Sequence, residues 1–162
     1  MWRSLAIFLA GGVLGVGLGT ALGFFLFPYV FPPPPATEQI TEAERTKVIA
    51  KGTFIHANPN DPIHYGQGNV TVYEGTVFLE RDFEVGPGPD FHVYLVPTKD
   101  VRSEGDVSST MFVDLGKLRS FKGSQKYAIP GGVDLKKYPS VVIWCQQFGV
   151  LISPADLTFT GS

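Results

Sequence analysis

A long stretch without charged residues near the start of the chain constrains its fold more than any other feature. From Leu5 to Phe31 the sequence contains no charged side chain. The 23 residues of Leu5–Phe27 would form a helix of about 34 Å, at about 1.5 Å per residue. Such a helix covers the roughly 30 Å hydrocarbon core of a bilayer. The sequence therefore predicts an N-terminal transmembrane helix that anchors the chain, over residues 1–31.

A cleaved signal peptide is the alternative interpretation of this segment. The apolar core of a signal peptide spans only about 7–15 residues and ends at a small-residue cleavage site, and neither property fits this run. We therefore expect an uncleaved signal anchor. Positive charge at Arg3 precedes the span, whereas Glu38, Glu42 and Glu44 follow it. The positive-inside rule then predicts a cytoplasmic N-terminus and a periplasmic or extracellular C-terminal domain.

Four glycines recur at every fourth position of the predicted helix and share one face, namely Gly11, Gly15, Gly19 and Gly23. Small residues at this spacing let two membrane helices approach closely. Glycine is also frequent in membrane helices that do not associate. The spacing predicts a helix-packing face, through which the chain would form a homo-oligomer.

A proline-rich linker follows the predicted anchor over residues 32–50. Its four consecutive prolines favour a stiff polyproline II spacer and end the membrane helix. Thr41 and Glu44 stand at the spacing of a capping box, which predicts a short helix over about residues 41–50. We expect this segment to hold the following domain off the bilayer.

The third segment, residues 51–162, consists of short β-type runs separated by Gly, Pro, Asn and Asp. Glu74-Gly75 is a candidate two-residue hairpin turn, and residues 91–96 alternate between two faces as a strand does. A polar loop is expected over residues 98–110. Regularly spaced short strands predict an all-β fold, an antiparallel β-sandwich or barrel of about nine strands.

Charge argues against nucleic acid as a partner. The 12 basic and 15 acidic residues after the span leave a net charge near −3, and no basic stripe runs along them. Binding to the phosphate backbone therefore has no electrostatic support.

Cys145 is the only cysteine of the chain. By strand alternation it shares a face with Val141 and Ile143, whereas Trp144 shares the other face with Val142. Both faces are apolar, which predicts a central strand and a buried thiol. Free cysteine is among the most buried residue types, so Cys145 is either a small apolar filler or a reactive sulfur.

Familiar redox and metal motifs are missing from the sequence. It contains no C-x-x-C pair, and His56, His64 and His92 all precede Cys145, unlike the order of ligands in blue-copper proteins. Three acids, Asp82, Glu84 and Asp90, lie close in sequence; they fit a site for a hard cation or, more simply, a solvated turn. We predict no metal site, and no cofactor is encoded by a recognisable pattern.

Two blocks of the sequence are nevertheless distinctive together, "DFEVGPGPDFHVYLVP" and "QKYAIPGGVDLKKYPSVVIWCQQFGVLISPADL". With the early Gly52-Thr53-Phe54, they resemble the DM-thirteen domain, also called the electron-transfer DM domain, over residues 51–159. The family pattern has a G-x-F, then F-x-x-G-x-G-P-D-x-x-V-Y-L, then Y-x-[IVL]-P, and it closes on W-C-x-x-F-x-V. All four parts occur here in that order.

The resemblance implies a redox or electron-transfer role centred on Cys145, with Trp144 as its neighbour. Asp90, in the G-P-D turn, and the nearby His92 are further candidate site residues. In animal proteins the family accompanies membrane cytochromes, so a membrane redox protein or cytochrome is the partner implied, besides the lipid bilayer. The chain would then be an electron-transfer module rather than an enzyme. The alternative is a binding or scaffold β-sandwich at the membrane surface, with Cys145 as a filler.

Overall fold

The computed structural model describes residues 2–45 and 47–161. The chain divides into two compact units, Met1–Pro32 and Pro33–Ser162. The first unit is the helix α1, Trp2–Val30, whose side chains bury nothing within the protein. It is long and apolar enough to cross a membrane, a property that an N-terminal signal sequence shares. For the four glycines of its predicted packing face, a Cβ would meet no atom within 4 Å, so that packing stays a prediction.

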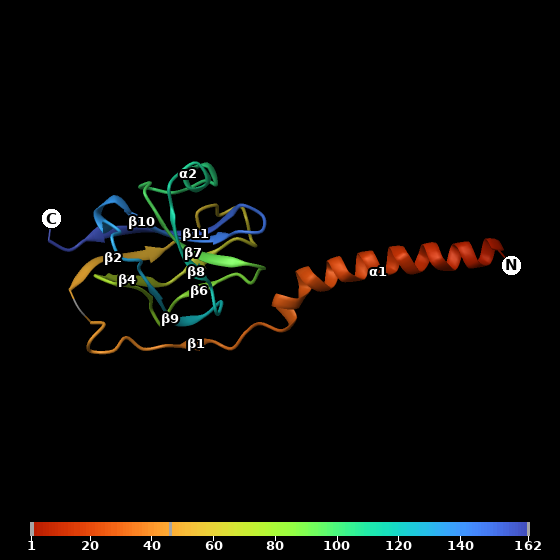
Figure 1. The fold of residues 1–162 in the computed structure, drawn as a ribbon, viewed down its shortest axis with the longest axis horizontal. Helices are drawn as coiled ribbons and strands as arrows, with labels where there is room; N and C mark the ends of the chain where they lie inside the picture. Colours follow the sequence, from red (N-terminus) through yellow and green to blue (C-terminus); the bar gives the residue numbers. More distant parts are fainter. Residues whose placement is uncertain (1, 46, 162) are drawn as a thin grey trace. The chain divides into compact units, whose positions relative to one another are not determined.

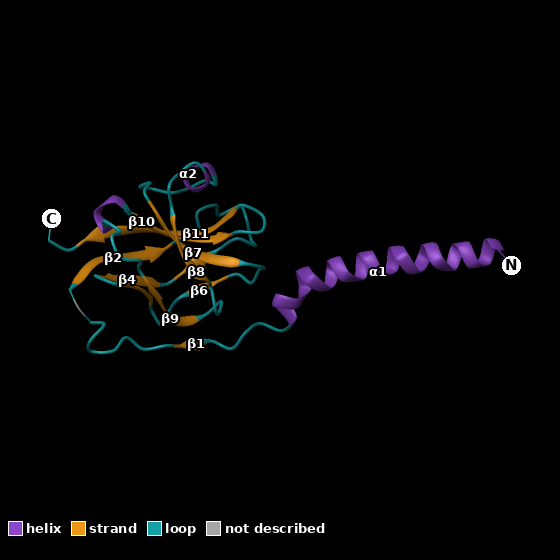
Figure 2. Cartoon of the chain, in the orientation of Figure 1, coloured by secondary structure: helices purple, strands orange, loops and turns teal. Residues whose placement is uncertain are grey.

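The second unit is built mainly from short strands (Figures 1 and 2). Its strands, among the described residues, are β1 (Ala36–Thr37), β2 (Val48–Phe54), β3 (Gly66–Gln67), β4 (Asn69–Tyr73), β5 (Thr76–Leu79), β6 (Glu84–Val85), β7 (Phe91–Val96), β8 (Val113–Lys117), β9 (Gly123–Ala128), β10 (Ser140–Cys145) and β11 (Val150–Phe159). Two short helical segments join them, α2 (Gly105–Ser108) and the 3₁₀ turn η1 (Leu135–Lys137).

Nine of these strands form one curled sheet, a half-barrel, in the order β1-β9-β5-β4-β2-β11-β10-β7-β8. Every neighbouring pair in it is antiparallel except β1 and β9, which run parallel. A second, two-stranded sheet pairs β3 with β6. The predicted all-β fold is therefore confirmed, although one edge of the sheet is parallel.

The inner face of the curled sheet holds the main hydrophobic core. Along β7, Phe91, Val93 and Leu95 point into this core, whereas Tyr94 and Val96 belong to a second buried cluster on the outer face. The outer cluster also contains Val101 and Val107, which come from the loop of residues 97–110 and its helix α2. The strand alternation and the long loop predicted from the sequence are both present.

The hairpin predicted at Glu74-Gly75 is also confirmed. β4 and β5 pair across these two residues, with Val72 opposite Val77. Both valines are buried, so the turn is fixed by packing on the inner face as well as by its own residues.

The helix predicted over residues 41–50 is wrong beyond its first turn. The capping box forms: the Thr41 N–H donates to Glu44 Oε2 (2.9 Å), and the Glu44 N–H donates to Thr41 Oγ1 (3.3 Å). The chain does not continue as a helix, because Val48–Ala50 belong to β2 and pair with β4 and β11. Residues rich in β-branched side chains gain more from this pairing and burial than from a short exposed helix.

Residues 34–44, predicted as part of a spacer, instead form a strap along β9. The Pro34 carbonyl accepts from the Ser120 hydroxyl (2.8 Å), and the Ala36 N–H donates to the Lys122 carbonyl (2.8 Å). The Glu38 N–H donates to the Ser124 carbonyl (3.0 Å). The strap therefore closes one edge of the sheet with main-chain hydrogen bonds.

Two acids of the strap bind the basic side chains of the neighbouring segment. Arg119 contacts both carboxylate oxygens of Glu38, at 2.8 and 3.0 Å, and the Lys126 ammonium lies 2.6 Å from Glu44 Oε1. The Lys126 contact, with the capping hydrogen bonds of Thr41, lowers the pKa of Glu44 to about 2. Glu38 and Glu44 thus pair with Arg119 and Lys126, two basic residues at the edge that the strap covers.

Gly123 tests whether this strap contributes to stability. It has φ +87°, and a Cβ at this position would collide with the Ala36 carbonyl oxygen. Gly123→Ala should lower the free energy of unfolding by more than the ~1–3 kcal/mol expected of backbone strain alone. It should also speed hydrogen exchange of the Ala36 and Glu38 amides. Urea unfolding and amide exchange measure the two effects.

Gly116→Ala is the matched control, because Gly116 also has a positive φ (+114°) but open space around its Cβ position. Equal losses of stability in the two variants, with unchanged exchange at the strap amides, would contradict a stabilising role for the strap.

Candidate functional site

Cys145 is the last residue of β10, opposite Phe91, the first residue of β7. Its side chain is 3% exposed and packs in the inner core, on the face it shares with Val141 and Ile143. The predicted central strand and buried thiol are therefore confirmed. The position at the end of the strand is what the alternation pattern could not reveal.

The sulfur has a polar neighbour in spite of its burial. The Cys145 Sγ–H donates to the Pro89 carbonyl oxygen over 3.3 Å. Pro89 belongs to the partly exposed loop of residues 87–90, and the turn of residues 146–149 after Cys145 is exposed throughout. We call the end of the sheet formed by this loop, this turn, Phe91 and Cys145 the thiol end.

The surroundings favour the neutral thiol. Burial is the main cause that raises the pKa of Cys145 above its ordinary value, and the Asp90 carboxylate adds to it. Hydrogen bonds from the backbone amides of Phe148 and Gln147 act in the opposite direction and are weaker in sum. Because the thiolate is the reactive species, Cys145 is less reactive at neutral pH than an exposed cysteine.

Asp90 and His92 belong to a network of charges beside the thiol. Asp90, a non-glycine residue at φ +52°, lies 2.9 Å from the Lys117 ammonium, and this contact is the main cause that lowers its pKa. His92 Nδ1 lies 3.0 Å from both oxygens of Asp114, and its Nε2 lies 3.7 Å from Asp90 Oδ1. The Gln146 N–H donates to the Asp90 carbonyl (3.0 Å), which ties the turn over Cys145 to this network.

Trp144 lies on the outer face of the sheet, away from the sulfur. Its ring stacks on Tyr94 with 6.4 Å between centroids, and Tyr94 in turn stacks on Phe112 at 4.3 Å. Gln146 Nε2 donates to the Tyr94 hydroxyl over 3.2 Å. Sequence reasoning missed this aromatic stack, because Phe112 lies just before β8 and only the β7–β8 pairing brings it beside Tyr94.

The other two histidines gather around a different residue. His64 Nδ1 lies 2.6 Å from Asp61 Oδ2, and His56 Nε2 lies 2.7 Å from the Asp61 carbonyl oxygen. His64 and two backbone amides lower the pKa of Asp61 to about 2. Both histidines are thus held by Asp61, whereas the Cys145 sulfur is bonded to Pro89.

The three acids weighed as a cation site each have other partners. Asp82 accepts from the Asn69 side-chain amide (2.6 Å), Glu84 binds the Lys122 ammonium (2.8 Å), and Asp90 binds Lys117. Among residues 2–45 and 47–161, no three His, Cys, Asp or Glu side chains are arranged to hold a metal ion. Asp82 and Asp90 lie in turns, whereas Glu84 lies in β6.

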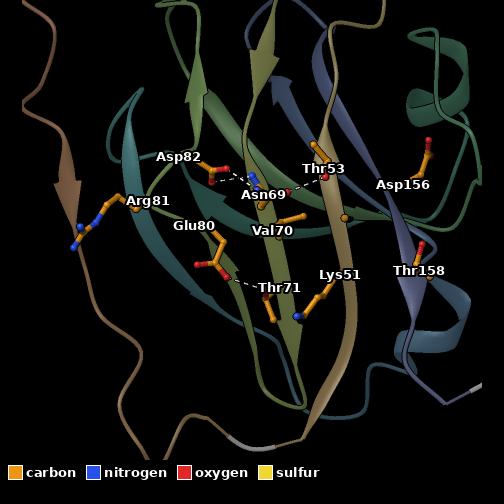
Figure 3. Close-up of a pocket in the computed structure, with 11 residues that line it drawn as sticks. Lys51, Thr53, Asn69, Val70, Thr71, Glu80, Arg81, Asp82, Asp156 and Thr158 are labelled. Atoms are coloured by element: carbon orange, nitrogen blue, oxygen red, sulfur yellow. Dashed lines mark hydrogen bonds between the residues drawn. The ribbon is translucent and has the colours of Figure 1, made fainter.

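A shallow groove of about 830 Å³ lies on the outer face of β2, β4 and β11 (Figure 3). Its polar side chains are largely bonded to one another: Thr53 donates to Asn69 Oδ1 (2.9 Å), and Thr71 donates to Glu80 Oε1 (2.8 Å). Neither Cys145 nor its neighbours line it. It is a separate surface that the sequence did not point to.

Fold and site together define a small β domain with one protected thiol, preceded by an apolar helix. A family model described as electron transfer DM13 matches residues 60–157, which is more than half of the chain. The chain therefore belongs to this family, as its sequence motifs indicated. The matched range includes the G-P-D turn and the W-C strand but begins after Gly52-Thr53-Phe54. No curated protein and no solved structure matches the chain.

The raised pKa of Cys145 predicts a pH dependence of stability. An unfolded cysteine titrates at about pH 8.5, so its contribution to folding is complete below this value. The contribution is lost as the pH rises through the higher pKa of the folded state. Between about pH 8.5 and 10, native protein should lose stability relative to Cys145→Ala, by up to about 1.4 kcal/mol per pH unit. Urea unfolding under reducing conditions measures the difference.

The comparison with Cys145→Ala also removes the effect of other titrating groups. The raised pKa values of Tyr94 and Tyr127, for example, are common to both proteins. A difference in stability between the two proteins that stays constant from pH 7 to 10 would show that folding does not raise the pKa of the Cys145 thiol.

Proposed function

We propose that the chain is a membrane-anchored electron-transfer domain, that its β unit lies outside the cytoplasm, and that Cys145 is its redox group. The family to which the chain belongs and the apolar helix α1 support the general assignment. The redox role of Cys145 and the orientation are our inference from the residues and the geometry of the thiol end.

One observation carries this proposal: the sulfur lies at the end of the core, not at its centre. It is bonded to the Pro89 carbonyl, and backbone amides of the exposed turn of residues 146–149 donate to it. Two main-chain hydrogen bonds close the turn, from the Gly149 N–H to the Cys145 carbonyl (2.9 Å) and from the Gln146 N–H to the Asp90 carbonyl (3.0 Å). A local opening that breaks these few bonds exposes the thiol while the sheet stays intact.

The reaction we propose is thiol–disulfide exchange with a disulfide of a membrane redox protein. In the open state the Cys145 thiol loses its proton, and the thiolate attacks one sulfur of that disulfide. A bond forms between Cys145 and the attacked sulfur, the original disulfide bond breaks, and the leaving sulfur departs as a thiolate that takes up a proton. Cys145 is oxidised and the leaving sulfur is reduced. A second thiolate of the partner then attacks the partner's sulfur in this mixed disulfide: a disulfide forms within the partner, the bond to Cys145 breaks, and the Cys145 sulfur leaves as a thiolate that takes up a proton.

The alternative function is a binding or scaffold domain, and the groove on the outer face of the sheet favours it. That groove offers threonine hydroxyls, amides and charged groups on three adjacent strands (Figure 3). In this case Cys145 only fills space in the core, and its replacement by alanine would leave function intact.

Native-state labelling of the thiol separates the two functions. At pH 7.5, an aromatic disulfide reagent should modify Cys145 in the folded, full-length protein faster than the protein unfolds. The rate should change little with low urea, because local opening exposes little surface. Absorbance of the released thiol gives the rate, and urea unfolding kinetics give the comparison. Labelling that proceeds only at the rate of global unfolding would contradict the redox function and favour the scaffold function.

Gly149→Ala should accelerate this labelling by about fivefold or more. Gly149 has φ +65°, and ~1 kcal/mol of strain in the closed turn changes an opening equilibrium by about that factor. Gly161→Ala is the matched control, because Gly161 also has a positive φ (+94°) but lies near the C-terminus. An equal effect of the two substitutions would contradict opening at the turn.

Labelling from outside the membrane tests the anchor and its orientation. In a Cys145→Ala background, a membrane-impermeant maleimide should modify Glu74→Cys in intact spheroplasts and should not modify Ser4→Cys. Both proteins should remain in the membrane after an alkaline carbonate wash. The reverse labelling pattern would overturn the proposed orientation, and release by carbonate would indicate a cleaved or uninserted helix.

A further inference from the structure

The aromatic stack leads from strand β10 to the surface of the β unit. The centroids of the Tyr94 and Phe112 rings lie 4.3 Å apart, with 6° between the ring planes. The Tyr94 and Trp144 rings stack at 6.4 Å, with 27° between their planes. Tyr94 and Trp144 are buried, whereas Phe112 is 37% exposed and the preceding Met111 is 85% exposed. The stack therefore connects the buried outer cluster with solvent.

Two members of this stack carry side chains that lose an electron readily. A phenol and an indole have loosely held π electrons, unlike the valines that surround them in the outer cluster. At 4.3 Å the parallel rings of Tyr94 and Phe112 are in van der Waals contact. An electron that leaves Tyr94 thus has a continuous path through the Phe112 ring to the surface.

The charges around Tyr94 favour the loss of an electron from its ring. Asp114 is opposite Tyr94 in the register of β7 and β8. Burial is the main cause that raises the pKa of Tyr94, and the carboxylates of Asp114 and Asp90 add to it. The same negative charges attract the positive charge that develops on the ring when an electron leaves.

The phenol proton has a way out of this buried site. Gln146 Nε2 donates to the Tyr94 hydroxyl oxygen over 3.2 Å, and the Gln146 side chain belongs to the exposed turn of residues 146–149. The hydroxyl therefore lies beside a side chain that reaches water. Loss of the proton together with the electron leaves a neutral ring, so no unpaired charge remains buried.

Tyr127 is a buried tyrosine with the opposite surroundings. Its hydroxyl donates to Gln125 Oε1 (2.9 Å), and its side chain is 2% exposed. The guanidinium carbon of Arg119 lies 4.4 Å from the centroid of the Tyr127 ring. A fixed cation over the ring opposes the loss of an electron. Tyr127 thus provides a matched comparison for Tyr94 within the same chain.

We propose that Tyr94 is a second redox group of the domain, a one-electron donor whose electron leaves through Phe112 to an acceptor beside Met111. The acceptor is a one-electron metal centre, such as a ferric haem, and it is reduced by one electron. Tyr94 loses that electron and gives its hydroxyl proton to water beside Gln146, which leaves a neutral tyrosyl radical. One electron from a one-electron reductant and one proton from water restore the phenol. This inference goes beyond the proposed function, because it does not involve the Cys145 sulfur.

Laser-flash kinetics on the full-length chain in detergent test the proposal. In a Cys145→Ala background, a ruthenium polypyridyl complex is attached at Met111→Cys, and a flash with a sacrificial quencher oxidises it to ruthenium(III). The return of the ruthenium(II) absorbance gives the rate of electron transfer from the protein. Tyr94→Phe keeps the ring and its packing but removes the donor, so it should slow this return by about tenfold or more. Tyr127→Phe should leave the rate unchanged.

A second pair of variants tests the path of the electron. Phe112→Leu removes the ring between Tyr94 and the surface and should slow the return of ruthenium(II). Phe121→Leu removes a ring that pairs with Phe91 outside the stack, and it should leave the rate unchanged. Equal effects of these two variants would contradict a path through Phe112.

Equal rates in the labelled parent and in Tyr94→Phe would overturn the inference, as would equal slowing by Tyr94→Phe and Tyr127→Phe. Circular dichroism and urea unfolding of each variant show that the compared proteins are folded. Because Cys145 is replaced in every sample, a negative result leaves the thiol chemistry of Cys145 to the labelling experiment. Failure of that labelling, in turn, does not affect electron transfer from Tyr94.

Discussion

The burial of β10 on both faces is the constraint on which the rest of the β unit depends. All six of its residues are buried, three side chains in the inner core and others in the outer cluster. A strand that is apolar on both sides must lie inside a sheet, and each of its two faces must be covered by other parts of the chain. The curl of the sheet supplies the inner cover, and the loop that carries α2 supplies the outer one. Cys145 takes its surroundings from this arrangement.

Local patterns made much of this fold predictable. The alternation of residues 91–96 and 141–145 assigned side chains to the correct faces, and Glu74-Gly75 marked a real hairpin. Pairing between distant segments was not predictable in the same way. The strap meets β9 more than 80 residues further along the chain, and nothing within residues 34–44 reveals that edge. The capping box at Thr41 was recognised correctly, but it closes a single turn before a strand.

In the candidate site, too, local patterns predicted some features, whereas contacts between distant segments could not be predicted. Burial of the thiol followed from the apolar residues around it, and the family motifs drew attention to Asp90 and His92. The carbonyl that accepts from the sulfur and the partners of His92 come from other strands and loops. Their contribution depends on sheet register, which a single sequence does not specify. The other two histidines, His56 and His64, are held by Asp61 instead.

The strap also has a consequence for the solubility of the folded chain. β9 would otherwise end the sheet with a row of unpaired amide and carbonyl groups, and such an edge can pair with the same edge of another molecule. β1 occupies that edge over two residues, and the ion pairs of Glu38 and Glu44 hold the neighbouring chain across it. If α1 holds the chain in a membrane, copies are concentrated in two dimensions, and this cover would limit sheet-to-sheet aggregation there.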